Sequence, residues 1–466
     1  MKPKTALFYA GMLAVAVGLF FWIRSAGESL IAPVRMTLGH YAKNPPSEPI
    51  SLFTHVLLAL VVILLCARGL GAFFQRFGQP PVIGEMIAGI LLGPSLLGRI
   101  SPGLFNDLLP NQVAPYLSVI ANIGVILYMF LVGVELNTKL LRKRTHASIA
   151  TSHASIVVPF LLGSALALWL YPMYSTNDVR FVVFALFMGV SMSVTAFPVL
   201  ARVVTDRGMQ QDHLGNIALA CAAVDDVTAW CLFALVVSVA QAHAGRVLLT
   251  LGLTAGFIFA VFVFLNPAAK WVVRRHAQRR QTGQSSIVIA CVALLLAALT
   301  TQWIGIHALF GAFLVGTIIP HDSRLAQDIK QKFEDLVVIL FLPAFFAFTG
   351  LRTQIGLLHG GADWAICLII IIVASLGKFG GGTIAAWLTG LGWREAASLG
   401  ILMNTRGLME LIVLNVGLDL GVLSPELFAM LVIMAIVTTF ATTPVLQVLA
   451  REREVPRRPI AVSEKT

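Results

Sequence analysis

The chain has 466 residues, of which 58% are hydrophobic and only 12% are charged, and its mean hydropathy is +0.87. Soluble domains carry about 25% charged residues, and about 20 consecutive apolar residues are enough to span a bilayer. The composition therefore argues against a soluble enzyme and predicts an all-α polytopic membrane protein. The five cysteines form no CxxC pair and no disulfide framework, so we expect them to be packing residues.

Fourteen apolar segments are candidates for membrane spans. In chain order they cover residues 5–23, 51–70, 80–97, 115–135, 148–171, 181–202, 213–240, 247–266, 286–303, 306–319, 335–351, 363–389, 395–418 and 426–449.

The first segment has two interpretations. The stretch MKPK followed by the uncharged run 5–23 could be a signal peptide or a retained membrane helix. The run is longer than the 7–15 residues that are usual for the apolar part of a signal peptide, which favours a retained helix. We therefore expect residues 1–50 to form an extra membrane helix and an extracytoplasmic linker.

The basic residues predict the orientation of the chain. If the N-terminus is cytoplasmic, 24 Lys and Arg residues lie in cytoplasmic segments and 7 outside, and only Lys378 and Arg406 lie at membrane depth. Such an excess is typical of the cytoplasmic side, where basic loops face anionic lipid. It also accounts for the net charge of +11 without a nucleic-acid partner. We expect a location in the inner (plasma) membrane, with cytoplasmic termini and a short tail over 451–466.

Beyond the first segment, thirteen spans remain: two sets of six and one linker span between them. The first set covers 51–240, one linker span covers 247–266, and the second set covers 286–449. Because the linker adds one crossing, the two sets begin on opposite sides of the membrane. This is the inverted-repeat arrangement of secondary transporters.

Two adjacent acids interrupt an apolar span in the stretch AAVDDVTAW. An aspartate at mid-span costs about 2.5–3.5 kcal/mol if it is unpaired, so Asp225 and Asp226 need a reason to be there. Neighbours on a helix point about 100° apart, so one acid can face a partner while the other faces a cavity. Lys378, in the glycine-rich stretch ASLGKFGGG, is the obvious partner at the same depth. A purely structural salt bridge is the alternative interpretation.

The stretch SMSVTAFPVLARVV predicts a broken helix. Pro198 lacks an N–H, so one carbonyl in the preceding turn loses its donor, and in lipid a free carbonyl is costly. Ser193 and Thr195 place hydroxyls beside the break. Freed carbonyls and hydroxyls are what a dehydrated monovalent cation needs, although an ordinary proline kink would look the same.

The corresponding span of the second set contains LMNTRGLMELIV. Asn404, Thr405 and Arg406 form a polar interruption, and Glu410 follows Arg406 by four residues, on the same helix face. Interrupted segments at matching positions of two repeats indicate the central site of a transporter. We expect Arg406 and Glu410 to be structural, with Arg406 compensating the opposed helix ends.

Together with PPVIGEMIAGILLGPSLLG and LGKFGG, these motifs resemble the monovalent cation:proton antiporter-2 family, which includes NapA-type sodium/proton antiporters and plant cation/proton exchangers. The resemblance covers about residues 51–450. It implies a thirteen-helix inverted-repeat fold with a dimerisation domain and a core domain in which two broken helices cross, and hence a homodimer. It further implies that Asp226 carries the cation and the proton, that Asp225 pairs with Lys378, and that Thr195 belongs to the first crossing. The extra N-terminal helix departs from this pattern.

The residues themselves favour a transporter that exchanges Na⁺ or K⁺ for protons. Burial favours the protonated form of a carboxylate, so that a proton and a cation can compete for Asp226 near neutral pH. Lys378 serves either as a permanent counter-ion of Asp225 or as a second proton carrier, and the second role predicts electrogenic exchange. The alternatives are an ion channel or a transporter-fold sensor. No motif indicates an enzyme, a bound cofactor or a resident metal; the only metal expected at Asp226 is the transported cation.

Overall fold

The computed structural model describes residues 3–28, 30, 49–110, 112–135, 146–176, 178–209, 212–241, 247–278 and 284–450. All regular elements within these ranges are helices. In chain order they are α1 (Pro3–Gly27), α2 (Pro49–Arg76), α3 (Pro81–Leu92), α4 (Leu97–Ile100), α5 (Pro102–Leu108), α6 (Ala114–Glu135), α8 (His146–Tyr174), α9 (Phe181–Ser193), α10 (Phe197–Asp206), α11 (His213–Gln241), α12 (Val247–Ala260), η2 (Val261–Leu265), α13 (Asn266–Gln278), α14 (Gln284–Ile304), α15 (Ala308–Thr317), α16 (Arg324–Leu336), η3 (Val337–Phe341), α17 (Leu342–Arg352), η4 (Ile355–Leu357), α18 (Gly360–Ser375), η5 (Leu376–Gly380), α19 (Gly381–Leu388), α20 (Trp393–Met403), α21 (Leu408–Asp419) and α22 (Pro425–Ala450).

The predicted apolar segments all contain helix, and the prediction of an all-α polytopic membrane protein is confirmed. Within the described ranges, 11 helices are long and apolar enough to cross a membrane. A twelfth span consists of α20 and α21, which are bent by 43° at the break between them. Two shorter apolar helices, Ala14–Gly27 and Ala308–Thr317, correspond to the first and the tenth predicted segments.

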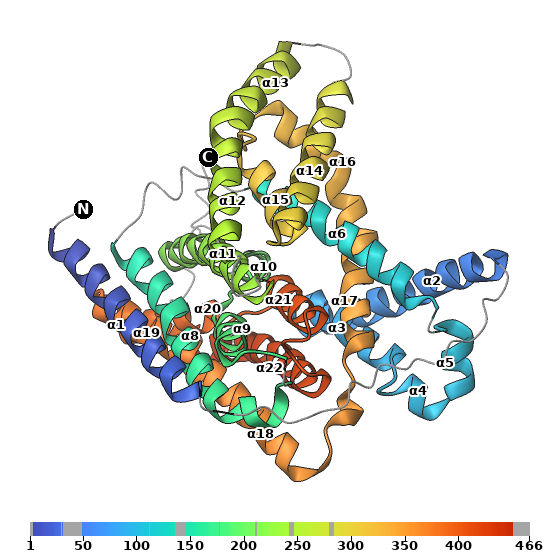
Figure 1. Cartoon of the computed structure of the whole chain (residues 1–466), viewed down its shortest axis with the longest axis horizontal. Coiled ribbons are helices and arrows are strands. Elements are labelled where there is room, and N and C mark those ends of the chain that lie inside the picture. The colour runs from blue at the N-terminus through green and yellow to red at the C-terminus, as the bar shows by residue number, and fades with distance from the viewer. Residues whose placement is uncertain are drawn as a thin grey trace, which may run out of the picture.

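The helices form two groups, which Figure 1 displays side by side. We call α8–α11 and α18–α22 the core group, and α2–α6 and α12–α17 the panel group. Both halves of the chain contribute to each group: α19 packs on α8 in the core, and α17 packs on α3 and α6 in the panel. The additional helix α1 packs on α8 and α9 of the core group. The two groups touch each other through α11 with α12, α17 with α21, and α22 with α3.

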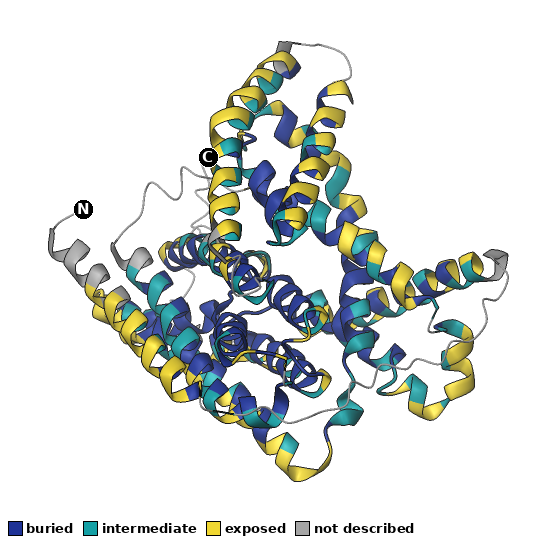
Figure 2. Cartoon of the chain, viewed as in Figure 1, coloured by how far each residue is buried: buried dark blue, intermediate teal, exposed yellow. Residues whose placement is uncertain are grey.

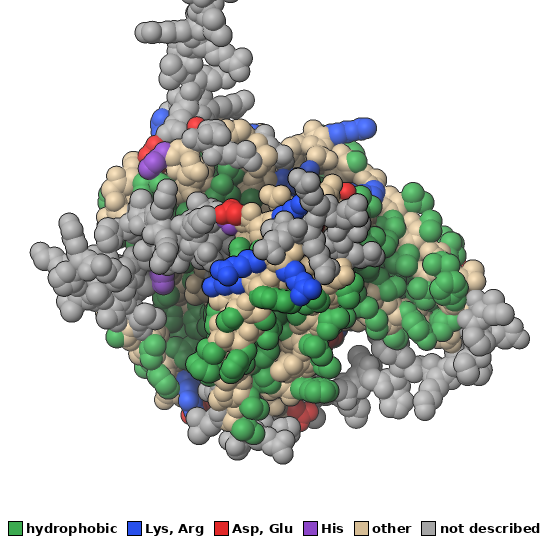
Figure 3. Space-filling view, turned by 90° about the horizontal axis from the view of Figure 1, so that it is seen from above, with side chains coloured by type: hydrophobic (Ala, Val, Ile, Leu, Met, Phe, Trp, Pro, Cys, Tyr) green, Lys and Arg blue, Asp and Glu red, His purple; other side chains and the backbone are tan. Residues whose placement is uncertain are grey.

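Burial follows this arrangement, as Figure 2 illustrates. The broken span α9–α10 is 78% buried over its most apolar stretch, whereas the linker helix Gly252–His276 is only 6% buried. Hydrophobic side chains also cover much of the molecular face in Figure 3. Soluble monomers rarely expose contiguous apolar patches larger than a few hundred Å², so these outer faces fit a lipid environment. The polar residues of the predicted site lie in the buried centre of the core group.

Glycines allow close helix contacts in the panel group. A Cβ atom on Gly89 of α3 would lie 2.3 Å from the carbonyl oxygen of Ala347 in α17, whereas a Cβ atom on Gly69 of α2 would meet nothing within 4 Å. We expect Gly89→Ala to lower the free energy of unfolding by about 1–3 kcal/mol through overpacking. Gly69→Ala should change it by less than about 1 kcal/mol. Thermal unfolding in detergent compares the two, and equal midpoints would contradict the close contact.

Candidate functional site at the crossing of two broken helices

Two spans are interrupted where they meet in the core group. Residues 194–196 separate α9 from α10, and residues 404–407 separate α20 from α21. The two interruptions are joined directly, because the backbone N–H of Ala196 donates to the carbonyl of Thr405 at 3.0 Å. Pro198 lies in the first turn of α10, where a helix does not need its N–H. The sequence stretches predicted to break their helices therefore do so, and the breaks cross.

The C-terminal end of α9 points at two cationic side chains. The last four carbonyls of a helix have no partner within it, and this end carries partial negative charge. Arg406 donates from Nη1 to the carbonyl of Ser191 at 2.7 Å and from Nη2 to that of Met192 at 2.9 Å. Lys378 Nζ donates to the carbonyl of Ser193 at 2.5 Å. Three otherwise unpaired carbonyls are thus satisfied by positive charge.

Arg406 is held in place from both sides. Its side chain is fully buried and forms an ion pair with Glu410, which is also fully buried. Its backbone N–H donates to Thr439 Oγ1 at 2.9 Å, and the same hydroxyl donates to the carbonyl of Arg406 at 2.9 Å. These contacts fix the guanidinium group against the end of α9.

We expect Arg406→Lys to destabilise the protein. A lysine cannot reproduce the planar fork that contacts two carbonyls and Glu410 at once, so at least one charge-assisted hydrogen bond is lost, at a cost of about 1.5–3 kcal/mol. The control is Arg24→Lys, because the Arg24–Glu28 pair is about half exposed and contributes at most about 1 kcal/mol. Thermal unfolding in detergent measures both, and an unchanged midpoint for Arg406→Lys would contradict the capping role.

Asp225 is fully buried, and hydrogen-bond donors surround its carboxylate. Ser152 Oγ donates to Oδ1 at 2.5 Å, and Ser155 Oγ and Thr195 Oγ1 each donate to Oδ2 at 2.8 Å. Lys378 Nζ lies 3.2 Å from Oδ2. An ionised carboxylate only accepts hydrogen bonds, and here three hydroxyls and one ammonium group supply the donors. Both oxygens of Asp225 are thus paired with donors.

Lys378 uses all three of its ammonium hydrogens. Besides Asp225 and the carbonyl of Ser193, Nζ donates to the carbonyl of Ser155 at 2.9 Å. The residue lies in η5, a π-helical turn between α18 and α19, and such turns occur frequently at functional sites. A Cβ atom on the preceding Gly377 would lie 2.9 Å from Cα of Pro159, so the glycine allows α8 to approach the lysine closely.

Asp226 is buried like Asp225 but, within the described part of the chain, lacks a donor at one of its oxygens. Its side chain is 3% exposed, and its Oδ1 atom is buried without a hydrogen-bond partner among the described residues. Trp230, four residues further along α11 and on the same helix face, stacks on Phe313 of α15, so this face of α11 meets the panel group. A buried oxygen without a donor is costly unless something else satisfies it. A proton or a bound cation can do so.

A cavity of about 170 Å³ opens at this boundary. Glu85 of α3 and Tyr128 of α6 line it from the panel group, and Pro198, Arg202 and Leu408 line it from the core group. Glu85 is itself buried, with 7% of its surface exposed. The orientation predicted from the basic residues places this cavity on the cytoplasmic side of the two breaks.

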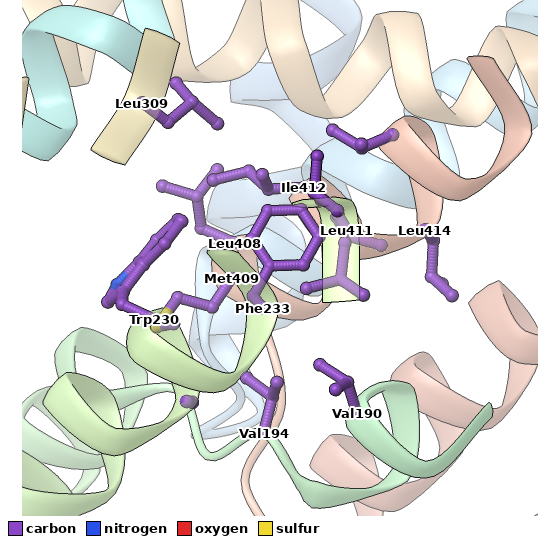
Figure 4. Close-up of a cluster of buried hydrophobic side chains, with 14 of the residues drawn as sticks. Val190, Val194, Trp230, Phe233, Leu309, Leu408, Met409, Leu411, Ile412 and Leu414 are labelled. Carbon is purple, nitrogen blue, oxygen red and sulfur yellow. The ribbon is translucent and has the colours of Figure 1, made fainter. Parts of the chain in front are cut away.

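Buried apolar side chains pack around Trp230 near the helix breaks, as Figure 4 illustrates. Trp230 lies one helical turn beyond the acidic pair and is 1% exposed. Its ring stacks on Phe313 of α15 with centroids 6.2 Å apart and meets Phe233 edge-on at 6.0 Å. Leu309 of α15 and Met409 of α21 lie at the same cluster. We call this cluster around Trp230 the aromatic plug.

The predicted site residues do not all meet at one point. The hydroxyl of Ser193 donates to the carbonyls of Gly189 and Ile156, at 2.6 and 3.1 Å, and contacts neither carboxylate. The single hydroxyl hydrogen of Thr195 is shared between Asp225 Oδ2 at 2.8 Å and the carbonyl of Met403 at 3.1 Å. Both residues belong to the cluster around Asp225 and Lys378 rather than to the surroundings of Asp226.

The break between α20 and α21 brings no side chain into hydrogen-bond contact with either aspartate among the described residues. Thr405 Oγ1 donates to the carbonyl of Leu402 at 2.9 Å, which caps the end of α20. Asn404 is 2% exposed, and its Oδ1 atom has no partner among the described residues. Arg406 and Glu410 instead face the end of α9.

Sequence reasoning missed several polar residues of the core group. Ser152 and Ser155 of α8 both donate to Asp225. They are three residues apart, a spacing that places both on one helix face. Thr439 braces Arg406 from α22. Hydroxyls at helical spacing within apolar spans were the available signal, but they are also common where they only bond to their own helix.

Residues 56–451 match the family model of the sodium/hydrogen exchanger transmembrane region. The chain belongs to the sodium/hydrogen exchanger family. The resemblance drawn from the sequence motifs is thereby confirmed.

This exchanger-family chain has relatives in bacteria and eukaryotes. It is 44% identical over 392 residues to the Na⁺/H⁺ antiporter NhaS4 of Synechocystis sp., covering 84% of this chain and 95% of the relative. It is 35% identical over 412 residues to K⁺/H⁺ antiporter 1 of Saccharomyces cerevisiae and 37% identical over 396 residues to cation/H⁺ antiporter 19 of Arabidopsis thaliana. These two alignments cover 86% and 84% of this chain but only 47% and 49% of the relatives, so the chain spans about half of their length.

The fold of this family member is also that of a solved antiporter. The structure of the sodium proton antiporter MjNhaP1 from Methanocaldococcus jannaschii superposes with a TM-score of 0.61, covering 86% of this chain and 98% of the other, at 15% sequence identity. The predicted antiporter fold, with its inverted repeat and crossed broken helices, is confirmed at the level of the fold.

Proposed function

We propose that the chain is a secondary active transporter that exchanges a monovalent cation, Na⁺ or K⁺, for protons by alternating access. One observation carries the proposal: Asp226 has a buried carboxylate oxygen without a donor, directly beside a fully paired Asp225, at the boundary between the two helix groups. The antiporters among its relatives, with names that specify Na⁺/H⁺, K⁺/H⁺ and cation/H⁺ exchange, support the same function.

The chemistry of exchange follows from the isolation of Asp226. Burial disfavours its charged form, so the carboxylate holds a proton until a cation replaces it. Since one group cannot hold both, each cation that binds releases a proton. If the core group moves only when Asp226 is neutralised by one or the other, the two fluxes are coupled.

Lys378 is the candidate carrier of a second proton in the exchange cycle. It is bound to Asp225 and two carbonyls, and it acts either as a permanent counter-ion or as a group that releases its proton when the cation enters. We propose the second role, which moves more protons than cations and makes exchange electrogenic. Proteoliposomes with an imposed membrane potential test this role. A rate that does not respond to the potential would contradict it.

An exchanger fits this geometry better than a channel does. A channel needs a continuous polar path, whereas here the cavity of about 170 Å³ beside the breaks is lined mostly by apolar side chains, and one of them, Leu408, belongs to the aromatic plug around Trp230. Proteoliposomes loaded with a pH-sensitive dye distinguish the two. In an exchanger, adding Na⁺, K⁺ or Li⁺ outside drives protons out of the vesicle without any ionophore, and the comparison identifies the cation. Absence of a pH change with all three cations would refute the proposal.

We further propose that the chain forms a homodimer in the plasma membrane, with both termini cytoplasmic. The exposed apolar faces of the panel group and the distribution of basic residues support this arrangement. Native mass spectrometry from detergent measures the oligomeric state. Labelling of a cysteine added at the C-terminus, in intact cells and in everted vesicles, reports the side on which the tail lies.

A further inference from the structure

Two helices from different groups run side by side across the domain boundary. α17 belongs to the panel group and α21 to the core group, and they are in contact (Figure 1). At one end, Phe346 of α17 and Leu408 of α21 line the cavity next to the helix breaks. At the other end, Arg352 of α17 meets Asp419 of α21. The two helices are therefore parallel, with the cavity at their first residues and a polar contact at their last.

The polar contact involves four side chains. Arg352 Nη2 lies 2.5 Å from Asp419 Oδ1, and Nη1 donates to Asn415 Oδ1 at 3.0 Å. Asn415 in turn donates from Nδ2 to Thr349 Oγ1 on α17 at 2.8 Å. Arg352 and Thr349 thus bind the core group through three hydrogen bonds, two of which pass through a largely buried asparagine.

The position of these contacts suggests what they do. α21 begins at the break in mid-membrane and ends at Asp419, 11 residues later, which corresponds to about 16 Å along a helix. The contacts therefore lie near the membrane surface opposite the cytoplasmic cavity. A motion that opens a path from this surface to Asp226 between α17 and α21 separates these two helices and breaks the contacts.

We infer that Arg352, with Thr349, Asn415 and Asp419, forms an extracytoplasmic latch that holds the transporter in its cytoplasm-facing state and opens once in every exchange cycle. The inference rests on the proposed function. Arg352 is a positioning residue: it touches neither the cation nor Asp226, and it acts by setting how often the core group faces each side.

The latch is weak enough to open in a working cycle. Arg352 is 23% exposed and Asp419 56% exposed at their side chains, so solvent screens the ion pair. We expect loss of the ion pair to shift the equilibrium between the two states by about two- to fivefold. A shift toward the outward-facing state lowers the apparent KM for the cation outside and raises it for the cation inside. A residue with a purely structural role would not change the two constants in opposite directions.

Cross-linking is the direct test. The five native cysteines are first replaced with alanine, and this background, once shown to exchange, receives Arg352→Cys and Asp419→Cys. A short bis-methanethiosulfonate reagent should join the two positions and stop exchange in proteoliposomes, and a reductant should restore it. Each single-cysteine variant, treated alike, is the control. Undiminished exchange after complete cross-linking would overturn the latch.

Charge variants provide the second test. Arg352→Gln and Asp419→Asn should each change the inside and outside KM values in opposite directions. The charge-swapped double variant, Arg352→Asp with Asp419→Arg, should return both KM values toward wild type. Parallel changes in the two constants, or no rescue by the charge-swapped double variant, would overturn the inference. If the wild-type protein itself exchanges no cation for protons, the proposed function fails, which is a different result from a failed latch.

Discussion

Asp226→Asn is expected to abolish cation/proton exchange. An asparagine cannot take up a proton and offers no charge to a cation. At an effective dielectric constant of about 20, the attraction between a carboxylate and a monovalent cation at contact distance is worth about 4 kcal/mol, or roughly a thousandfold in affinity. The measurement is the rate of dye-reported proton release from proteoliposomes on addition of the preferred cation. Residual exchange above a few per cent of wild type would refute the assignment of Asp226.

Two matched variants make this result specific. Asp226→Glu keeps the carboxylate but moves it by one methylene group, so it should retain exchange with a weaker apparent affinity. Asp107→Asn removes a carboxylate from an exposed position on α5 and should leave the rate unchanged. Thermal unfolding of all three proteins establishes that a lost rate does not reflect a lost fold. The asparagine variant should be no less stable than wild type, because it removes a buried acid whose Oδ1 atom has no donor among the described residues.

Lys378→Met should destabilise the protein far more than the loss of a surface ion pair would. It leaves the Asp225 charge and the carbonyls of Ser155 and Ser193 buried without their cationic donor. Removing one partner of a buried ion pair typically costs about 3–5 kcal/mol. The measurement is the thermal or denaturant-induced unfolding of detergent-solubilised protein, and a change below about 1 kcal/mol, the range of surface pairs, would contradict the buried pairing.

The double variant Lys378→Met with Asp225→Asn separates the ion pair from the rest of the cluster. With both charges removed, the asparagine oxygen accepts from the hydroxyls on one side, and its NH2 group donates to a hydroxyl oxygen on the other, so the hydroxyls of Ser152, Ser155 and Thr195 keep a polar partner. We expect the double variant to be more stable than Lys378→Met alone. A double-mutant cycle of wild type, the two single variants and the double variant gives the coupling energy of the pair. Additive effects of the two single changes would mean that the charges do not stabilise each other.

The properties that the sequence by itself determined are those that depend on local periodicity and on the cost of charge in lipid. The apolar runs located the spans because a helix must satisfy its backbone hydrogen bonds within each span. The positions of Asp225, Asp226, Lys378 and Arg406 at membrane depth could be identified because so few charged residues lie there. The helical angle of about 100° between neighbours also predicted that the two aspartates have different surroundings.

Only the tertiary structure decided which partners these groups have. Arg406 binds the carbonyls of Ser191 and Met192, more than 200 residues away along the chain, and no local pattern specifies such a contact. The same holds for the hydroxyls of Ser152 and Ser155 at Asp225. Hydroxyl and carbonyl groups occur in every span, so they become a site only where packing of separate helices brings them to one charge. The sequence shows where charge is buried; the packing of the helices determines which of those charges are paired and which one is left free to bind an ion.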